Sequence, residues 1–113
     1  MGFFNELISK VQCSNCKSFY EARIQFKFGA TRQLEYRLDD KIIWGFNEVG
    51  KPAIAKVKVY GVLGDEECPI CHNKNKHDEF DIFIEKDTII GLSEMASLSD
   101  YNVNEDRYKI LIE

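Results

Sequence analysis

Four cysteines, the only ones in this chain of 113 residues, carry its most reactive side chains. They form two Cys-x-x-Cys pairs, Cys13-Ser14-Asn15-Cys16 and Cys68-Pro69-Ile70-Cys71, which are separated by 51 residues. Two residues between ligands allow one tight turn to direct both sulfurs at a single point, and two such turns complete the tetrahedral shell that zinc favours. We therefore predict that Cys13, Cys16, Cys68 and Cys71 bind one structural zinc ion per chain.

The long separation of the two pairs bears on the architecture. It exceeds the roughly 15–20 residues of a minimal zinc finger, so the metal must join the ends of an inserted β-sheet. Such a link restricts the unfolded chain, and a structural zinc ion can contribute on the order of 10 kcal/mol to the folding of a small domain. The expected metal ion therefore cross-links two segments that are far apart in the sequence.

Three other interpretations of the cysteines stay open: two disulfides, a thioredoxin-like redox pair, or iron in the same sulfur shell. Disulfides need an oxidising compartment, and the N-terminal residues show neither an export signal nor a lipidation site. A redox Cys-x-x-Cys normally opens a helix, but a strand pattern follows Cys16. Zinc in a cytoplasmic protein is the preferred interpretation.

His72 and His77 are the only histidines, and each could replace a cysteine as a ligand, although four cysteines already complete a shell. His77-Asp78-Glu79 also contains the His-x-Glu element of zinc deaminases. In those enzymes the element precedes the cysteine pair, whereas here it follows Cys71 in a polar loop. No nucleophile elbow, phosphate-binding loop or His-Glu-x-x-His pattern occurs, so we expect no enzymatic activity.

Alternating apolar and polar residues predict a mainly β fold, in which a zinc-ribbon-like antiparallel sheet is closed by the four-cysteine zinc site. The clearest alternation lies within residues 19–28, where Ala22, Ile24 and Phe26 share one face. Strands are predicted at residues 19–28, 34–38, 42–44, 53–63, 80–85, 89–92 and 108–112, with a hairpin between 80–85 and 89–92. The apolar residues of the segment 3–10 recur near helical spacing and predict a short N-terminal helical turn, and residues 93–100 are compatible with another.

Length and composition indicate a globular chain. We expect one zinc-ribbon-like domain over residues 1–113, whose tail, residues 93–113, carries the weakest pattern. The 44% of hydrophobic and 30% of charged residues are typical of such a domain. No apolar run approaches the roughly 20 residues that cross a bilayer, so we expect no membrane contact.

The net charge of −4 is unevenly distributed along the chain. Residues 1–64 contain 10 Lys and Arg against 6 Asp and Glu, and residues 65–113 contain 5 against 13, which makes the two halves +4 and −8. A negative domain attracts nucleic acid weakly, so a protein partner is expected, with a basic surface that meets the acidic half. The carboxylates expected to bind it are those of Asp65, Glu66, Glu67, Asp78, Glu79 and Asp81.

Several motifs occur in a fixed order: Met1-Gly2-Phe3-Phe4, Cys13-x-x-Cys16, the strand Tyr20–Phe28, Leu34-x-Tyr36-x-Leu38-Asp39-Asp40, Cys68-Pro69-x-Cys71, and a strand with Phe80 and Ile82. Over about residues 1–92 this order resembles a loose group of small, uncharacterised bacterial and phage zinc-ribbon proteins, which begin Met-Gly-Met-Phe-Asp and carry two Cys-Pro-x-Cys-Gly units. The resemblance implies the zinc ribbon and its four ligands, and no particular role. This chain has Ser14 in place of the first Pro, and Lys17 and His72 in place of the Gly after each pair. Because those Gly positions often take a left-handed backbone, we expect strain at Lys17 and His72.

The leading functional expectation is a non-enzymatic, zinc-stabilised protein-binding module that uses its edge strands or its acidic half. An acidic immunity or antitoxin-type inhibitor of a basic enzyme falls in this class. The alternative is a nucleic-acid-binding zinc ribbon, in which Lys and Arg follow the phosphates and aromatic rings stack on bases. Its phosphate track would be Arg23, Lys27, Arg32, Arg37, Lys56 and Lys58, with Phe19, Tyr20 or Tyr36 as stacking platforms.

Overall fold

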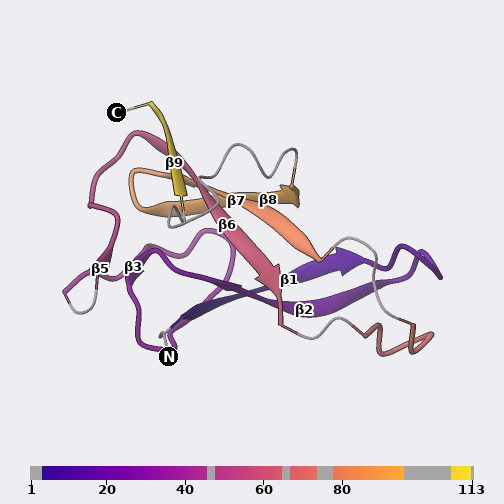
Figure 1. The fold of residues 1–113 in the computed structure, drawn as a ribbon. Coiled ribbons are helices and arrows are strands. Elements are labelled where there is room, and N and C mark those ends of the chain that lie inside the picture. The colour runs from indigo at the N-terminus through magenta and orange to yellow at the C-terminus, as the bar shows by residue number, and fades with distance from the viewer. Residues whose placement is uncertain (1–3, 46–47, 65–66, 74–77, 96–107, 113) are drawn as a thin grey trace.

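The computed structural model of the chain describes residues 4–45, 48–64, 67–73, 78–95 and 108–112 (Figure 1). Within these ranges the chain forms nine β-strands and no helix, which confirms the mainly β prediction. None of the described residues belongs to a helix that could cross a membrane. The strands are β1 (Asn5–Gln12), β2 (Phe19–Phe26), β3 (Gly29–Ala30), β4 (Glu35–Tyr36), β5 (Glu48–Val49), β6 (Lys56–Leu63), β7 (Glu79–Glu85), β8 (Thr88–Glu94) and β9 (Tyr108–Ile112).

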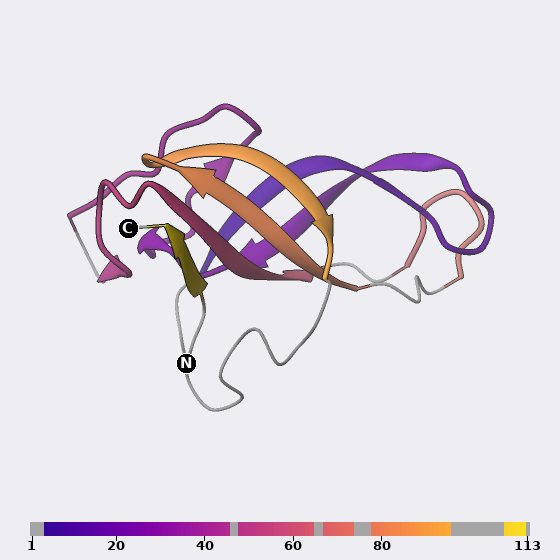
Figure 2. The ribbon, with the colours of Figure 1, turned by 90° about the horizontal axis from the view of Figure 1, so that it is seen from above.

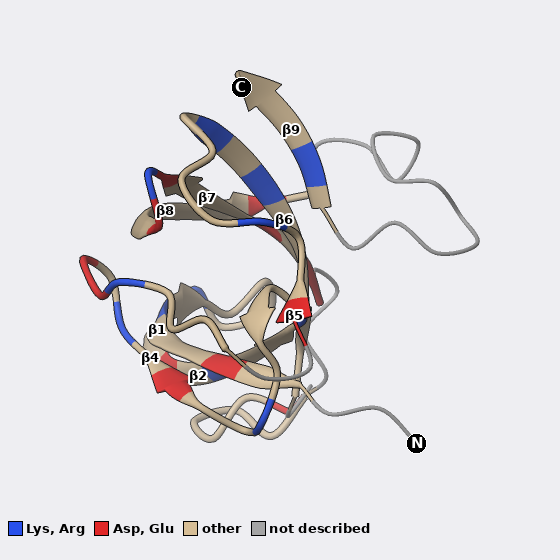
Figure 3. Cartoon of the chain, turned by 90° about the vertical axis from the view of Figure 1, so that its left-hand side faces the viewer, with Lys and Arg blue, Asp and Glu red and all other residues tan. Residues whose placement is uncertain are grey.

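Seven of these strands form one sheet in the order β4-β1-β2-β6-β7-β8, with β9 added to β6, while β3 and β5 form a separate pair. Neighbouring strands are antiparallel except β1 and β4, which are parallel. Both edges of β6 are used: β7 pairs along one, and β9 and β2 share the other. The sheet is strongly curved, so β1 and β2 face β7 and β8 across the interior (Figures 2 and 3).

The segment after β4 links the two ends of this strand order. The backbone N–H of Asp39 donates to the carbonyl of Ile89 at 2.7 Å, and the N–H of Ile89 donates to the carbonyl of Asp40 at 2.9 Å. The N–H of Ile42 donates to the carbonyl of Asp87 at 2.7 Å. β4 and β8 are thereby connected, and the curved sheet closes into an irregular barrel.

This closure corrects one prediction. The strand predicted at residues 42–44 is not formed, and the neighbouring Lys41 makes only an isolated bridge with Thr88. The apolar side chain of Ile42 is buried because the segment seals the barrel. An apolar run that is buried without continuous strand pairing therefore has the same sequence pattern as a strand.

The interior is filled by the inward faces of the alternating strands. Leu7, Ile24, Val59 and Ile82 have no exposed surface. Gly61 lies where β2 meets β6, and a Cβ at this position would come within 2.6 Å of Ile24 Cγ2 and 3.1 Å of Ile82 Cδ1. The packing of these two isoleucine side chains therefore leaves no room for a side chain at position 61.

The helical turn predicted over residues 3–10 is wrong, because β1 begins at Asn5 and continues to the end of that range. Leu7, Ile8 and Val11 have the spacing of a helix face, but Leu7 and Val11 point into the barrel and Ile8 is buried on the opposite side. β1 pairs along its whole length with β2 and also contacts β4. These long-range backbone bonds outweigh the local helical pattern.

The remaining strand predictions are confirmed with adjusted bounds. An observed strand overlaps each of the ranges 19–28, 34–38, 53–63, 80–85, 89–92 and 108–112: the first three strands are shorter than predicted, β7 and β8 are longer, and β9 has the predicted bounds. The predicted hairpin is also present, since β7 pairs with β8 and Glu85 lies opposite Thr88. In the second predicted helical turn, residues 93–94 belong to β8, and residues 96–100 lie outside the described part of the chain.

Candidate metal centre

The two cysteine pairs lie side by side at one end of the sheet (Figures 1 and 2). The first pair is in the turn that joins β1 to β2, and the second is in the segment between β6 and β7. β6 runs antiparallel to β2, with Leu63 opposite Ile24, so the segment that follows β6 continues toward the beginning of β2. Strand pairing thus brings together two segments that are far apart in the sequence.

The four sulfur atoms form one compact cluster, as the cysteine spacing predicts. Cys13 Sγ lies 3.6 Å from Cys71 Sγ, Cys16 Sγ lies 3.8 Å from Cys68 Sγ, and all four sulfurs are within 4.8 Å of one another. Sulfurs about 2.3 Å from a tetrahedral metal ion would be about 3.8 Å apart, so the cluster fits such an ion. A disulfide needs about 2.05 Å, and all four cysteines are free.

Backbone hydrogen bonds fold the first cysteine turn. The N–H of Cys13 donates to the carbonyl of Ser18 at 2.9 Å, and the N–H of Lys17 donates back to the carbonyl of Cys13 at 3.1 Å. Inside the turn, the N–H of Asn15 points at Cys13 Sγ from 3.3 Å. This last bond stabilises negative charge on the sulfur, as a metal-ligating thiolate requires.

The second turn repeats the same three bonds at the same relative positions. The N–H of Cys68 donates to the carbonyl of Asn73 at 3.0 Å, and the N–H of His72 donates to the carbonyl of Cys68 at 2.8 Å. The N–H of Ile70 lies 3.4 Å from Cys68 Sγ. Two unrelated stretches of sequence therefore adopt one turn geometry, which supports a common purpose for both turns.

The residue after each pair has a left-handed backbone, as expected from the Gly that it replaces. The φ angle is 64° at Lys17 and 62° at His72. A residue with a Cβ in this region costs roughly 1–2 kcal/mol relative to the right-handed region. The two turns are thus kept at a local cost, which their hydrogen bonds and the sulfur cluster must offset.

Hydrogen bonds and crowding shift the thiol pKa values in opposite directions. The pKa of Cys13 falls from 9.0 to about 6, chiefly because the backbone N–H of Cys16 stabilises its thiolate. The backbone N–H of Ser18 lowers the pKa of Cys16 in the same way. For Cys71 the N–H of Asn73 acts in that direction too, but burial and the three neighbouring sulfurs raise its pKa to about 11. The metal-free cluster therefore combines thiolate with thiol, and a divalent cation would replace the retained proton.

The first cysteine of each pair is fully buried, and the second is partly exposed. His72 is not part of the cluster: its side chain is 73% exposed, and its Nδ1 lies 3.6 Å from Glu67 Oε1. His77 lies outside the described residues. Four cysteines alone therefore make up the candidate metal site in the described part of the chain.

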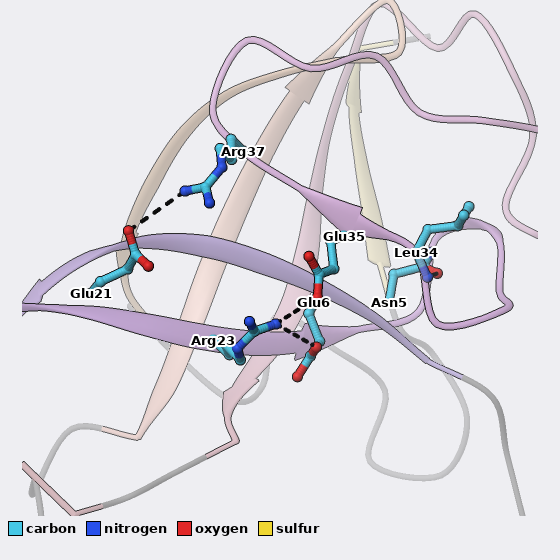
Figure 4. Close-up of polar contacts among 7 residues, drawn as sticks. All are labelled: Asn5, Glu6, Glu21, Arg23, Leu34, Glu35 and Arg37. Atoms are coloured by element: carbon cyan, nitrogen blue, oxygen red, sulfur yellow. Dashed lines mark hydrogen bonds and ion pairs between the residues drawn. The ribbon is translucent and has the colours of Figure 1, made fainter.

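In the described part of the chain, residues of both charges occur on both sides of the barrel (Figure 3). Arg23 Nη1 lies 2.8 Å from Glu35 Oε2 and 3.1 Å from Glu6 Oε1 (Figure 4). Arg37 Nη1 lies 3.6 Å from Glu21 Oε2. Carboxylates of the nominally basic half thus pair with two arginines of the expected phosphate track, both more than half exposed.

Two lysines of the same track also have carboxylate partners. Lys58 Nζ lies 3.8 Å from Asp81 Oδ2 in a pair whose side chains are only 10% and 2% exposed. Lys56 Nζ lies 3.9 Å from Glu85 Oε2 at the surface. Four of the six basic residues predicted to follow phosphates are therefore already paired with acids.

The stacking platforms predicted for nucleic-acid binding are mostly inaccessible. Tyr20 and Tyr36 are buried in the core, so their prediction as stacking platforms is wrong. The hydroxyl of Tyr36 accepts a hydrogen bond from the N–H of Ile43 at 3.0 Å. This bond holds the segment that closes the barrel. Only Phe19, 64% exposed, presents its ring to solvent.

The carboxylates predicted to bind a partner differ in their exposure and in their contacts. Asp81 is 1% exposed, so its prediction as a surface contact is wrong, because it points away from solvent toward Lys58. Glu79 accepts a hydrogen bond from the Tyr60 hydroxyl at 2.6 Å, whereas Glu67 is 59% exposed. Asp65 and Glu66 lie outside the described residues.

A groove of about 390 Å³ lies beside the second cysteine turn, and the sequence did not predict it. One side is lined by residues of β2 together with Glu6 of β1, and the other side, the wall, by Gly64, Glu67 and Pro69. The N–H of Gly64 donates to the carbonyl of Arg23 at 2.9 Å, which holds the wall against the strand. The alternation of β2 indicated an outward face, but nothing local indicated which segment lies over it.

Comparison of the chain with protein-family models, with curated proteins and with solved structures finds no match. The functional assignment therefore rests on the geometry of the cysteine turns and of the surface around them.

Proposed function

We propose that this chain is a non-enzymatic, zinc-stabilised protein-binding module of the cytoplasm, in which Cys13, Cys16, Cys68 and Cys71 hold one zinc ion. The observation that carries this proposal is the sulfur cluster, with all four Sγ atoms within 4.8 Å of one another on two turns of equal hydrogen bonding. A reducing compartment keeps these thiols available for metal. Zinc suits the site because a tetrahedral shell of four thiolates is its usual structural environment.

The metal chemistry is structural in this proposal. Four thiolates saturate a tetrahedral ion, so no position remains for water or substrate. The ion links the β1–β2 turn to the segment before β7 and so supports the end of the barrel. Iron would fit the same four sulfurs, and the metal analysis below separates the two.

A protein partner is favoured over nucleic acid by the pairing of the basic side chains. Arg23, Arg37, Lys56 and Lys58 each lie within 4.0 Å of a carboxylate, which lowers their attraction for phosphate. A net charge of −4 acts in the same direction. An acidic inhibitor of immunity or antitoxin type, directed at a basic enzyme, remains the specific form of binding module that we put forward.

The metal is tested on the full chain, purified under mildly reducing conditions. We expect about one zinc and no iron per chain, and unchanged zinc in His72→Ala and His77→Ala. Cys68→Ser should lose the ion, and because that variant can also unfold, zinc release from the wild type is titrated in parallel with a thiol reagent. Folded chain without bound metal would contradict the proposal.

The role is tested with mixed-sequence single-stranded RNA and DNA near 0.1 M salt. We expect no salt-dependent binding in the micromolar range. Binding that disappears in the double variant Lys27→Glu with Arg32→Glu, two track residues that form no ion pair among the described residues, would establish the nucleic-acid alternative instead.

A further inference from the structure

The groove beside the second cysteine turn has an excess of negative charge. Glu6, Glu21 and Glu67 line it together with one cation, Arg23, so the lining carries a net charge of −2. Arg23 contacts Glu6 at 3.1 Å and, from outside the groove, Glu35 at 2.8 Å. This pairing compensates Arg23 and Glu6 together, so the excess negative charge of the lining lies on Glu21 and on Glu67, whose Oε1 is 3.6 Å from His72 Nδ1.

The lining carboxylates belong to different parts of the fold. Glu6 belongs to β1, Glu21 to β2, and Glu67 to the segment that enters the second cysteine turn. Glu21 also lies 3.6 Å from Arg37, but both side chains are more than 60% exposed (65% and 62%). Such an exposed pair contributes about 0–1 kcal/mol, so an incoming cation can displace Arg37.

Two large apolar side chains are exposed next to the groove. Phe19, 64% exposed, shares the outward face of β2 with Glu21, about 7 Å along the strand. Ile70, 54% exposed, directly follows Pro69, which lines the groove. Aromatic side chains such as that of Phe19 are enriched in protein interfaces, and Ile70 adds apolar area beside the groove.

The wall of the groove depends on the cysteine cluster. Pro69 lies between Cys68 and Cys71, and Glu67 immediately precedes this turn. A metal ion on the four sulfurs would therefore hold the wall at a set distance from β2. Rigid carboxylates bind a cation with a smaller loss of conformational entropy than mobile ones.

On the basis of the proposed zinc-stabilised binding function, we propose that this groove docks a lysine- or arginine-bearing segment of a partner protein. The cationic group enters between Glu21 and Glu67, and apolar residues next to it contact Phe19 and Ile70. Lysine and arginine fit this arrangement because their long aliphatic stems pack on apolar surface while the charged end reaches the carboxylates.

The test uses ¹⁵N-labelled, zinc-loaded full chain and a pair of blocked peptides, Leu-Arg-Gly-Lys-Leu and Leu-Glu-Gly-Glu-Leu. We expect the cationic peptide to shift the amide signals of β2 and of residues 64–70, with affinity that falls at least threefold between 50 and 300 mM salt. The anionic peptide should shift none of them. Glu21→Gln with Glu67→Gln should weaken binding at least fivefold, and Phe19→Ala with Ile70→Ala should weaken it as well.

The matched control is Glu85→Gln with Glu48→Gln, which removes the same charge away from the groove lining and should bind as the wild type does. The proposal is overturned by shifts centred elsewhere, by equal binding of both peptides, or by a groove variant that keeps both zinc and full affinity. It is also overturned if single-stranded RNA shifts the groove signals more than the peptide does. Zinc content is measured on every sample, so failure of the metal assignment is distinguished from failure of the groove.

Discussion

Lys17 and His72 hold the same place in the two cysteine turns, with φ angles of 64° and 62°. Each follows the second cysteine of its pair, and each donates its N–H to the carbonyl of the first. Both residues bear a Cβ in a left-handed conformation that suits glycine. The chain therefore carries two separate points at which a single substitution should improve stability.

We expect Lys17→Gly and His72→Gly each to raise the free energy of unfolding by about 0.5–1 kcal/mol. Removing the Cβ relieves roughly 1–2 kcal/mol of strain, and the greater freedom of glycine in the unfolded chain offsets part of that gain. Thermal unfolding of the zinc-loaded chain measures the change. Arg32→Gly, at a position without positive φ, should be destabilising, and a similar gain there would show that strain relief is not the cause.

Asn5 should be among the most sensitive polar residues. Its side chain is completely buried, donates to the carbonyls of Phe28 and Ala30 at 3.1 and 2.9 Å, and accepts from the N–H of Leu34 at 3.1 Å. Asn5→Ala leaves these groups without partners and should cost about 3 kcal/mol in urea unfolding. Gln12→Ala, which removes an exposed amide, should cost less than about 1 kcal/mol, and equal losses would contradict the role assigned to burial.

Gly61 should not tolerate a methyl group. Gly61→Ala places a Cβ 2.6 Å from Ile24 Cγ2, and overpacking of this kind costs roughly 1–3 kcal/mol. Gly91→Ala is the matched control, since its nearest neighbour would be Phe83 Cδ2 at 4.0 Å. Denaturant midpoints of the two variants should differ clearly, and identical midpoints would mean that the side chains of Ile24 and Ile82 repack at no cost.

Zinc affinity should rise with pH, because the ion has to displace thiol protons. The pKa of Cys71 is raised to about 11, so in the metal-free chain this thiol keeps its proton near neutral pH and releases it on binding. The pKa of Cys13 is lowered to about 6, so its proton competes with the ion only in more acidic solution. We expect the affinity to increase at least about tenfold from pH 7 to 8, and more steeply below pH 6.

The direction in which pH changes the stability of the zinc-loaded chain follows from the same thiol protons. If the folded chain binds zinc as proposed, the stability of the loaded chain should fall as pH falls, because protons compete with the ion for the thiolates. Competition with a chromophoric chelator at several pH values measures the affinity directly. A flat profile between pH 7 and 8 would mean that no thiol proton is released there.

The predictable parts of the fold are those that local pattern specifies. Alternation identified β2, β6, the β7–β8 hairpin and β9 because apolar and polar residues alternate along them, and β2 shows this most clearly by burying one face and exposing the other. It failed for β1, where Leu7 and Ile8 are both buried and the pattern is no longer of period two. The barrel closure through Asp39–Ile42 could not be predicted, since it depends on backbone bonds to residues more than forty positions away.

In the candidate site, too, the local sequence pattern predicts some features, and others depend on contacts between distant segments. Two Cys-x-x-Cys pairs are a strong local signal, and the four sulfurs lie where that signal predicts. The groove was invisible because Glu6, Glu21 and Glu67 become neighbours only when β1, β2 and the segment after β6 are assembled. The acidic composition of residues 65–113 likewise led to the wrong prediction that Asp81 is a surface contact, whereas strand pairing buries it beside Lys58.

The distance in sequence between Cys13 and Cys71, 58 positions, has a consequence for synthesis in the cell. At translation rates of about 5–20 residues per second, roughly 3–12 s pass between the appearance of the two cysteines at the ribosome. The nascent chain holds an incomplete sulfur shell during that interval, and its β1–β2 edge has no β6 to cover it. We therefore expect zinc supply to act on the yield of folded chain, through competition between metal capture and aggregation, more than on molecules that have already folded.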